Sequence, residues 1–161
     1  MSHLACPVVF TLPRRVYVGD ASLRPLVESA CAQWNALRPG LFLVVNEPAA
    51  PVWVRKGSRT WVKMPIDDAQ SIVHWSGDVG PRWMAHELGH TLGLGDHVWP
   101  GLDLTGYHSA QVDDPADEAR YRGVMGYIDP MAVWFGDDDR RMVNHHFANA
   151  GKAILPMCAN S

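Results

Sequence analysis

The sequence predicts an α+β fold with a mixed twisted sheet and two helices in an upper half, then a smaller irregular lower half that ends in a helix. Three observations support this prediction. Short β-prone runs accompany one long amphipathic segment in the first half of the chain. A second helical segment, which carries two histidines, follows them near the middle. Turn formers then dominate until a final amphipathic stretch.

The elements of the upper half follow from local pattern. Residues 8–18 are β-prone and interrupted by a proline, which predicts one strand or two short pieces. Residues 22–37 carry apolar side chains at helical spacing and predict an amphipathic helix. Residues 41–46 predict a buried strand, and residues 72–75 predict another short strand.

Residues 52–55 and 60–64 predict two strands joined as a hairpin about Lys56-Gly57-Ser58. Valines alternate with tryptophan and arginine in these runs, so one face of each strand is apolar. Only a three-residue connection keeps both apolar sets on one face, and it places Trp53 opposite Trp61. We therefore expect the opposite face, with both tryptophans, to be available to contact a partner.

The lower half is predicted to be less regular. Residues 98–114 are rich in turn formers and predict an ordered loop. The run Asp137-Asp138-Asp139 precedes a second amphipathic segment, and acidic residues favour a helix N-terminus. The run could also bind calcium, but capping is the better explanation. We expect one domain over residues 1–161, with an upper subdomain at about 1–95, a lower one at 96–161 and a cleft between them.

Residues 86–97 read HELGHTLGLGDH and predict a zinc site. On a helix, His86 and His90 project from one face about one turn apart, so both can reach one divalent cation. Glu87 can hold a water at the metal without being a ligand. Gly93 lets the chain leave the helix through a left-handed turn, which brings Asp96 back as a third ligand.

His97 is the alternative third ligand, because it follows Asp96 directly and is the commoner ligand type. A shift of one residue in an extended segment turns the side chain away from the metal, so only one of the two can bind.

The motif resembles the signature of the metzincin metallopeptidases, HExxHxxGxx followed by a third ligand that is usually His. With Asp96 at that position and His97 after it, the chain is similar to the small bacterial peptidases of the snapalysin type. Residues 123–127, GVMGY, resemble the metzincin Met-turn, which implies that Met125 packs as an apolar floor under the ligands. Tyr127 matches a tyrosine that binds zinc or steadies the oxyanion in the astacin and serralysin branches; a buried packing role is an equal alternative.

The resemblance implies a zinc-dependent metalloendopeptidase with one zinc ion per chain, in which Glu87 serves as general base and then general acid. The alternative is a zinc-binding protein of the same fold that serves in binding or assembly, for example in a phage particle, with little or no turnover. We expect a polypeptide substrate and a monomer. A net charge of −3 gives no basic patch for nucleic acid, and no apolar run reaches the roughly 18 residues that cross a membrane.

Cysteines and the N-terminus give weaker indications. Cys31 falls on the apolar face of the first helix and is expected to be a buried thiol. Cys6 and Cys158 could form a disulfide. Residues 1–7 lack the basic and apolar regions of a secretory signal. The family resemblance implies secretion; otherwise we expect a cytoplasmic or virion-associated protein.

The remaining histidines and tryptophans are expected to be mostly structural. Four histidines have no ligand spacing to the motif and are predicted to be surface or hydrogen-bonded side chains: His74, His108, His145 and His146. Three tryptophans bracket the motif in sequence and could line the cleft, although core packing is the default for each: Trp75, Trp83 and Trp99.

Overall fold

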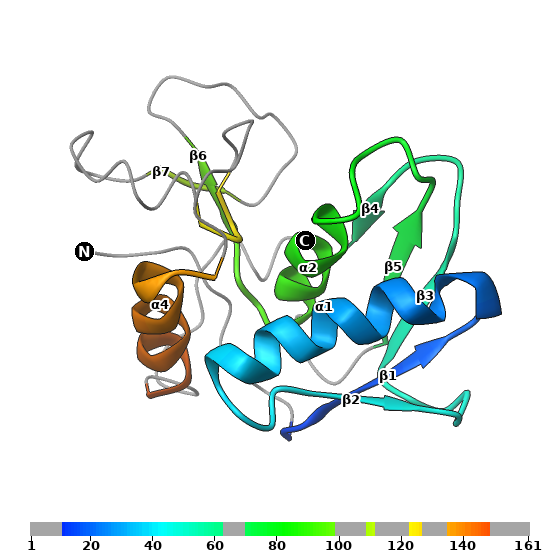
Figure 1. Cartoon of the computed structure of the whole chain (residues 1–161), viewed down its shortest axis with the longest axis horizontal. Helices are drawn as coiled ribbons and strands as arrows, with labels where there is room; N and C mark the ends of the chain where they lie inside the picture. The colour runs from blue at the N-terminus through cyan, green and yellow to red at the C-terminus, as the bar shows by residue number, and fades with distance from the viewer. Residues whose placement is uncertain (1–10, 63–69, 99–108, 112–122, 127–134, 149–161) are drawn as a thin grey trace.

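The computed structural model describes residues 11–62, 70–98, 109–111, 123–126 and 135–148. Its largest element is a five-stranded mixed sheet in the order β2-β1-β3-β5-β4, in which only β4 runs antiparallel to its neighbour. The strands are β1 (Arg14–Val18), β2 (Phe42–Val45), β3 (Val52–Lys56), β4 (Trp61–Val62) and β5 (Ser71–Trp75). With the helices described below, this arrangement confirms the predicted α+β class and its mixed sheet (Figure 1).

The first helix forms where its apolar spacing predicts it. A short 3-10 turn, Ala21–Leu23, leads into α1 (Arg24–Leu37). The Asp20 carboxylate accepts a hydrogen bond from the Ser22 backbone at 3.1 Å and caps the turn. One face of α1 is buried in the core through Val27, Ala30, Cys31, Trp34 and Leu37.

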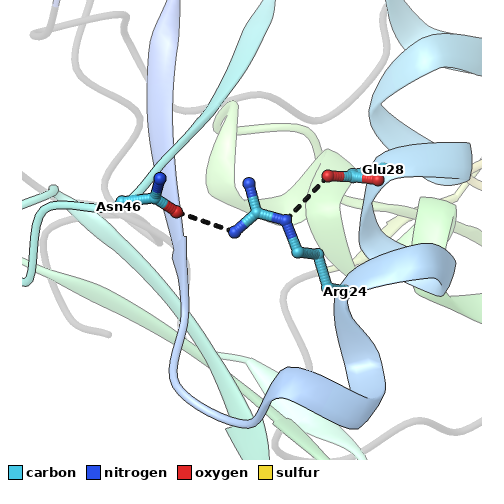
Figure 2. A network of polar contacts seen from close by, with 3 residues as sticks. All are labelled: Arg24, Glu28 and Asn46. Atoms are coloured by element: carbon cyan, nitrogen blue, oxygen red, sulfur yellow. Dashed lines mark hydrogen bonds and ion pairs between the residues drawn. The ribbon is translucent and has the colours of Figure 1, made fainter.

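A polar network joins the start of α1 to the end of β2 (Figure 2). The Arg24 guanidinium donates from Nε to Glu28 Oε1 and from Nη1 to Asn46 Oδ1, both at 2.8 Å. Arg24 and Glu28 are a surface i,i+4 pair, so the pair is worth only about 0.3–0.5 kcal/mol. It orients the helix start over the sheet more than it stabilises the fold.

The sheet has one buried face and one partly exposed face. Side chains on the buried face enter a single core with those of the helices: Val16, Val52, Val54, Val73 and Trp75. On the other face Tyr17 packs against Trp53, with ring centroids 4.8 Å apart. The prediction of a buried strand at 41–46 is therefore only half right, because β2 is an edge strand and Leu43 is 50% exposed.

The predicted hairpin between residues 52–55 and 60–64 is wrong. β5 lies between β3 and β4, parallel to the first and antiparallel to the second. Trp53 is opposite Ile72, and Trp61 is opposite His74. The alternation is as predicted in β3 and at Trp61 and Val62, while residues 63 and 64 lie outside the described residues. Alternation, however, identifies the buried face and not the neighbouring strand. The expectation of a partner-binding face rested on this register and falls with it.

His74 occupies the partly exposed face, away from the histidines of the motif. Its ring stacks on Trp61, with centroids 4.4 Å apart and planes 7° apart. Partial burial, helped by the nearby Arg55 cation, lowers the pKa of His74. The prediction of a structural histidine is confirmed at this position.

The described part of the lower half contains two strands and a helix. β6 (Asp96–Val98) pairs in parallel with β7 (Ser109–Gln111). The prediction of a loop without regular structure over 98–114 therefore misses β7 and the last residue of β6. α4 (Asp137–Ala148) confirms the predicted C-terminal helix. It lies apart from the sheet, beside the C-terminal end of α1 (Figure 1), where Arg38 Nη1 donates to Asn144 Oδ1 at 3.0 Å. No helix in the described ranges is long and apolar enough to cross a membrane.

Cys31 is the buried thiol that the sequence predicts, and it should resist thiol reagents in the folded chain. Burial, with a smaller contribution from Glu28, raises the pKa of the Cys31 thiol to about 12, and the thiolate is the reactive form. In a chain carrying Cys6→Ser and Cys158→Ser, a disulfide reagent at pH 8 should react slowly under native conditions and at once in denaturant. Equal rates in the two conditions would contradict the assignment.

Candidate metal centre

The two motif histidines lie together on the second helix, α2 (Trp83–Thr91). His86 is 1% exposed and His90 8% exposed, and their ring centroids are 4.8 Å apart with the planes nearly perpendicular. Polar side-chain groups that are buried are normally hydrogen-bonded. Here each ring is fixed by a backbone carbonyl.

Those carbonyls determine which nitrogen of each ring carries the proton. The Nδ1 of His86 lies 2.9 Å from the Val124 carbonyl oxygen, and the Nδ1 of His90 lies 2.7 Å from that of Leu94. Because a carbonyl oxygen only accepts, Nδ1 donates in both cases and the lone pair of each neutral ring is on Nε2. A histidine that binds a metal through Nε2 is normally held through Nδ1–H in this way.

Gly93 produces the local fold that holds His90. α2 ends with Leu94 N–H bonded to the Gly89 carbonyl and Gly93 N–H bonded to the His90 carbonyl. This pair of bonds is a Schellman ending, and it requires a left-handed residue at Gly93, whose φ is +88°. The turn folds the chain back so that the Leu94 carbonyl meets His90. The predicted left-handed exit from the helix is confirmed.

Glu87 differs from a structural glutamate in having no partner among the residues that the structure describes. It is partly exposed, between two buried neighbours, and no residue in the described ranges bonds its carboxylate. A helix-surface glutamate with a structural role usually pairs with a cation one turn away, as Glu28 does with Arg24. Glu87 therefore remains available to a molecule bound beside the histidines.

The segment Gly123–Gly126 forms the tight turn that the sequence predicts, closed by a bond from Gly126 N to the Gly123 carbonyl at 2.9 Å. Met125 is fully buried. It packs against α2 at Gly89, the residue directly before His90. Tyr127, the next residue of the predicted motif, lies outside the described residues.

Gly89→Ala should destabilise the chain by about 1–3 kcal/mol, the usual cost of overpacking a core. A Cβ at this position would lie 2.8 Å from Trp34 Cζ2 and nearer still to Met125 Sδ. Trp34 cannot yield easily, since it is buried and its Nε1 donates to the Ala85 carbonyl at 2.8 Å. The clash outweighs the roughly 1 kcal/mol by which alanine is favoured over glycine within a helix.

Denaturant unfolding measures the effect, with Gly80→Ala as the matched control because a Cβ at Gly80 meets nothing within 4 Å. If Gly89→Ala were as stable as Gly80→Ala, the packing of Trp34 and Met125 around Gly89 would not be rigid.

Asp139 belongs to this site, and the sequence did not assign it there. Its Oδ2 accepts from Gly136 N at 3.0 Å, a capping bond at the start of α4 that confirms capping for this member of the acidic run. Its Oδ1 accepts from Val124 N at 3.0 Å and so anchors the turn beneath His86. Acidic residues at a helix start indicated the first bond, but nothing local in the sequence indicates the second.

The third ligand is not tested by the described side chains. The backbone at Asp96 and His97 belongs to β6, but the side chains of both lie outside the described part. Within the described residues, no three His, Cys, Asp or Glu side chains gather so as to hold a metal ion. The structure thus brings together His86 and His90, with Glu87 between them in sequence, and the choice between Asp96 and His97 stays a prediction.

Comparison with known proteins supports the fold. No protein-family model matches the chain, and no curated protein matches it in sequence. Solved structures of myroilysin do match: one has 14% identity and a TM-score of 0.58 and aligns 87% of this chain with 86% of that one. A second has 13% identity and a TM-score of 0.59, with 91% and 83% of the two chains aligned. The chain therefore has a fold like that of myroilysin.

Proposed function

We propose that this chain is a zinc-dependent metalloendopeptidase of the metzincin type, similar to the snapalysin-like peptidases. The observation that carries the proposal is the pair of buried, perpendicular imidazoles on α2, each held at Nδ1 by a backbone carbonyl. The myroilysin-like fold supports it independently of the motif.

The donor set suits zinc. His86 and His90 would bind through Nε2, since Nδ1 of each ring is the donor to its carbonyl. Asp96, or alternatively His97, would complete three protein ligands and leave one position open, as catalytic zinc sites do. The buried Met125 packs on the same helix beside His90, in keeping with a Met-turn at residues 123–127.

Glu87 would perform the proton transfers. When bound, zinc supplies Lewis acidity, which polarises the scissile carbonyl and acidifies water. Glu87 takes the proton from the attacking water and then delivers it to the leaving amine, acting first as base and then as acid. Its partial exposure, and the lack of a partner for its carboxylate within the described ranges, are consistent with both steps. Tyr127 could steady the oxyanion, or it could serve only in packing.

Trp83 supports a preference for an apolar or aromatic residue just after the cleaved bond, as the snapalysin resemblance implies. Its ring centroid lies 4.7 Å from that of His86, and the side chain is partly exposed. An aromatic ring beside the reacting centre favours an apolar neighbour through contact area.

Metal analysis combined with digestion tests the proposal. After mild dialysis we expect about one zinc per chain, the stoichiometry of a single catalytic site. Casein or a peptide library should be cleaved, cleavage should stop with a chelator, and zinc should restore it.

Zinc at that stoichiometry without any cleavage would favour the alternative, a binding or assembly protein of the same fold. Cleavage that persists in a chain without metal would refute the zinc mechanism.

A further inference from the structure

We propose that α4 positions both zinc-binding histidines, with Asp139 holding His86 and His146 holding His90. The inference rests on the proposed function, since it assigns roles toward the metal site. Asp139 and His146 are seven residues apart, two helical turns, and therefore share one face of α4. Each is 5% exposed, and each bonds the backbone of a segment that holds one of the two histidines.

The first route runs through the turn Gly123–Gly126. Asp139 Oδ1 accepts from Val124 N at 3.0 Å, and the carbonyl of the same Val124 accepts from His86 Nδ1 at 2.9 Å. A buried carboxylate is costly unless its oxygens are hydrogen-bonded, and bonds to a charged acceptor are among the stronger ones. Asp139 thus fixes the residue whose carbonyl orients His86.

The fit at this contact leaves no space for adjustment. A Cβ on Gly123 would lie 2.5 Å from Asp139 Oδ1. Any larger residue at position 123 would displace the carboxylate or the turn.

The second route runs through the end of α2. His146 Nε2 lies 2.7 Å from the Leu92 carbonyl and, because that oxygen only accepts, donates to it. Leu92 is the C-cap of α2, and the chain then turns at Gly93 to place the Leu94 carbonyl 2.7 Å from His90 Nδ1. His146 thus holds the helix end from which the carbonyl partner of His90 departs.

Apolar side chains hold the same face of α4 against the rest of the molecule. Met142 and Val143 lie between Asp139 and His146 in sequence and belong to the single core that includes α2 and Met125. Their spacing of three and four residues from each polar contact places all four on one stripe. The stripe carries a separate polar contact toward each histidine, so each contact can be removed alone.

The test uses two variants that should disturb different histidines. In the metal-free chain, nitrogen NMR of the imidazoles should show the Nδ1–H form for both His86 and His90. Asp139→Asn should shift the His86 signals and spare His90, because an amide has one acceptor oxygen for two N–H donors. His146→Phe should do the reverse, and His146→Gln, which keeps an N–H donor, should restore much of the His90 pattern.

Zinc affinity, measured against a competing chelator, is the second readout. Asp139→Asn and His146→Phe should each lower the zinc affinity by roughly 10–100-fold, as loss of a hydrogen-bond partner of a metal ligand does. Asp137→Asn is the matched control, since Asp137 is an exposed carboxylate in the same helical turn. In Gly123→Ala the added Cβ should displace the Asp139 carboxylate from Val124 N. This variant should therefore change the His86 signals and the zinc affinity in the same way as Asp139→Asn.

Unchanged imidazole signals and wild-type zinc affinity in folded variants would overturn the proposal. Unfolding of the metal-free Asp139→Asn chain, or equal effects of each variant on both histidines, would also overturn it in favour of a purely structural helix. A wild-type chain that binds no zinc would refute the proposed function instead, while the NMR readout would still test the two contacts.

Discussion

Glu87→Ala is expected to leave the zinc content and the fold intact while reducing kcat by roughly 10²–10⁴-fold, the usual contribution of general acid–base catalysis. Glu87 has no partner among the described residues, so its removal breaks no internal bond. The two histidines keep their carbonyl partners in the variant, because those bonds come from Val124 and Leu94. The variant should therefore lose proton transfer and keep metal binding.

Peptide hydrolysis, metal analysis and thermal unfolding of the same preparation measure the three quantities. Glu28→Ala is the matched control: it removes an exposed helical glutamate that pairs with Arg24 on the first helix, and its kcat should be unchanged. Loss of zinc together with activity in Glu87→Ala would make Glu87 a ligand, which the metzincin mechanism does not allow.

Local patterns predicted the elements better than their arrangement. The spacing of apolar residues in 22–37 determines which face of a helix is buried, and α1 buries that face. The same logic placed Val52 and Val54 on the core side of β3. The hairpin failed because adjacency in a sheet depends on long-range pairing, and β5 could insert between β3 and β4 without changing the alternation of either strand.

In the candidate site, too, the local relations were predictable from the sequence and the long-range contacts were not. His86, Glu87, His90 and Gly93 lie within one helix and its exit, so helical geometry alone predicted how they relate. The carbonyl of Val124 and the carboxylate of Asp139 reach the helix from distant parts of the chain. Backbone carbonyls carry no sequence signature, and Asp139 resembles any acidic residue at a helix start. Such supporting contacts become visible only once the chain is folded.

Asp96→Ala is expected to weaken zinc binding far more than His97→Ala. The backbone of both residues is in β6, paired with Ser109 and Ala110 of β7. Successive residues of a strand face opposite sides, so only one of these positions can be turned toward α2. The metzincin spacing selects Asp96, six residues after His90.

Competition with a chelator measures the zinc affinity of each variant. Asp96→Ala should lose more than the roughly 10–100-fold that an outer-shell contact contributes, and His97→Ala should stay within that range. Asp96→His supplies a conservative test, because it keeps a zinc ligand at the position while removing a negative charge. It should retain zinc, because histidine is a common ligand of catalytic zinc sites. A larger loss for His97→Ala than for Asp96→Ala would transfer the third ligand to His97, with the rest of the site unchanged.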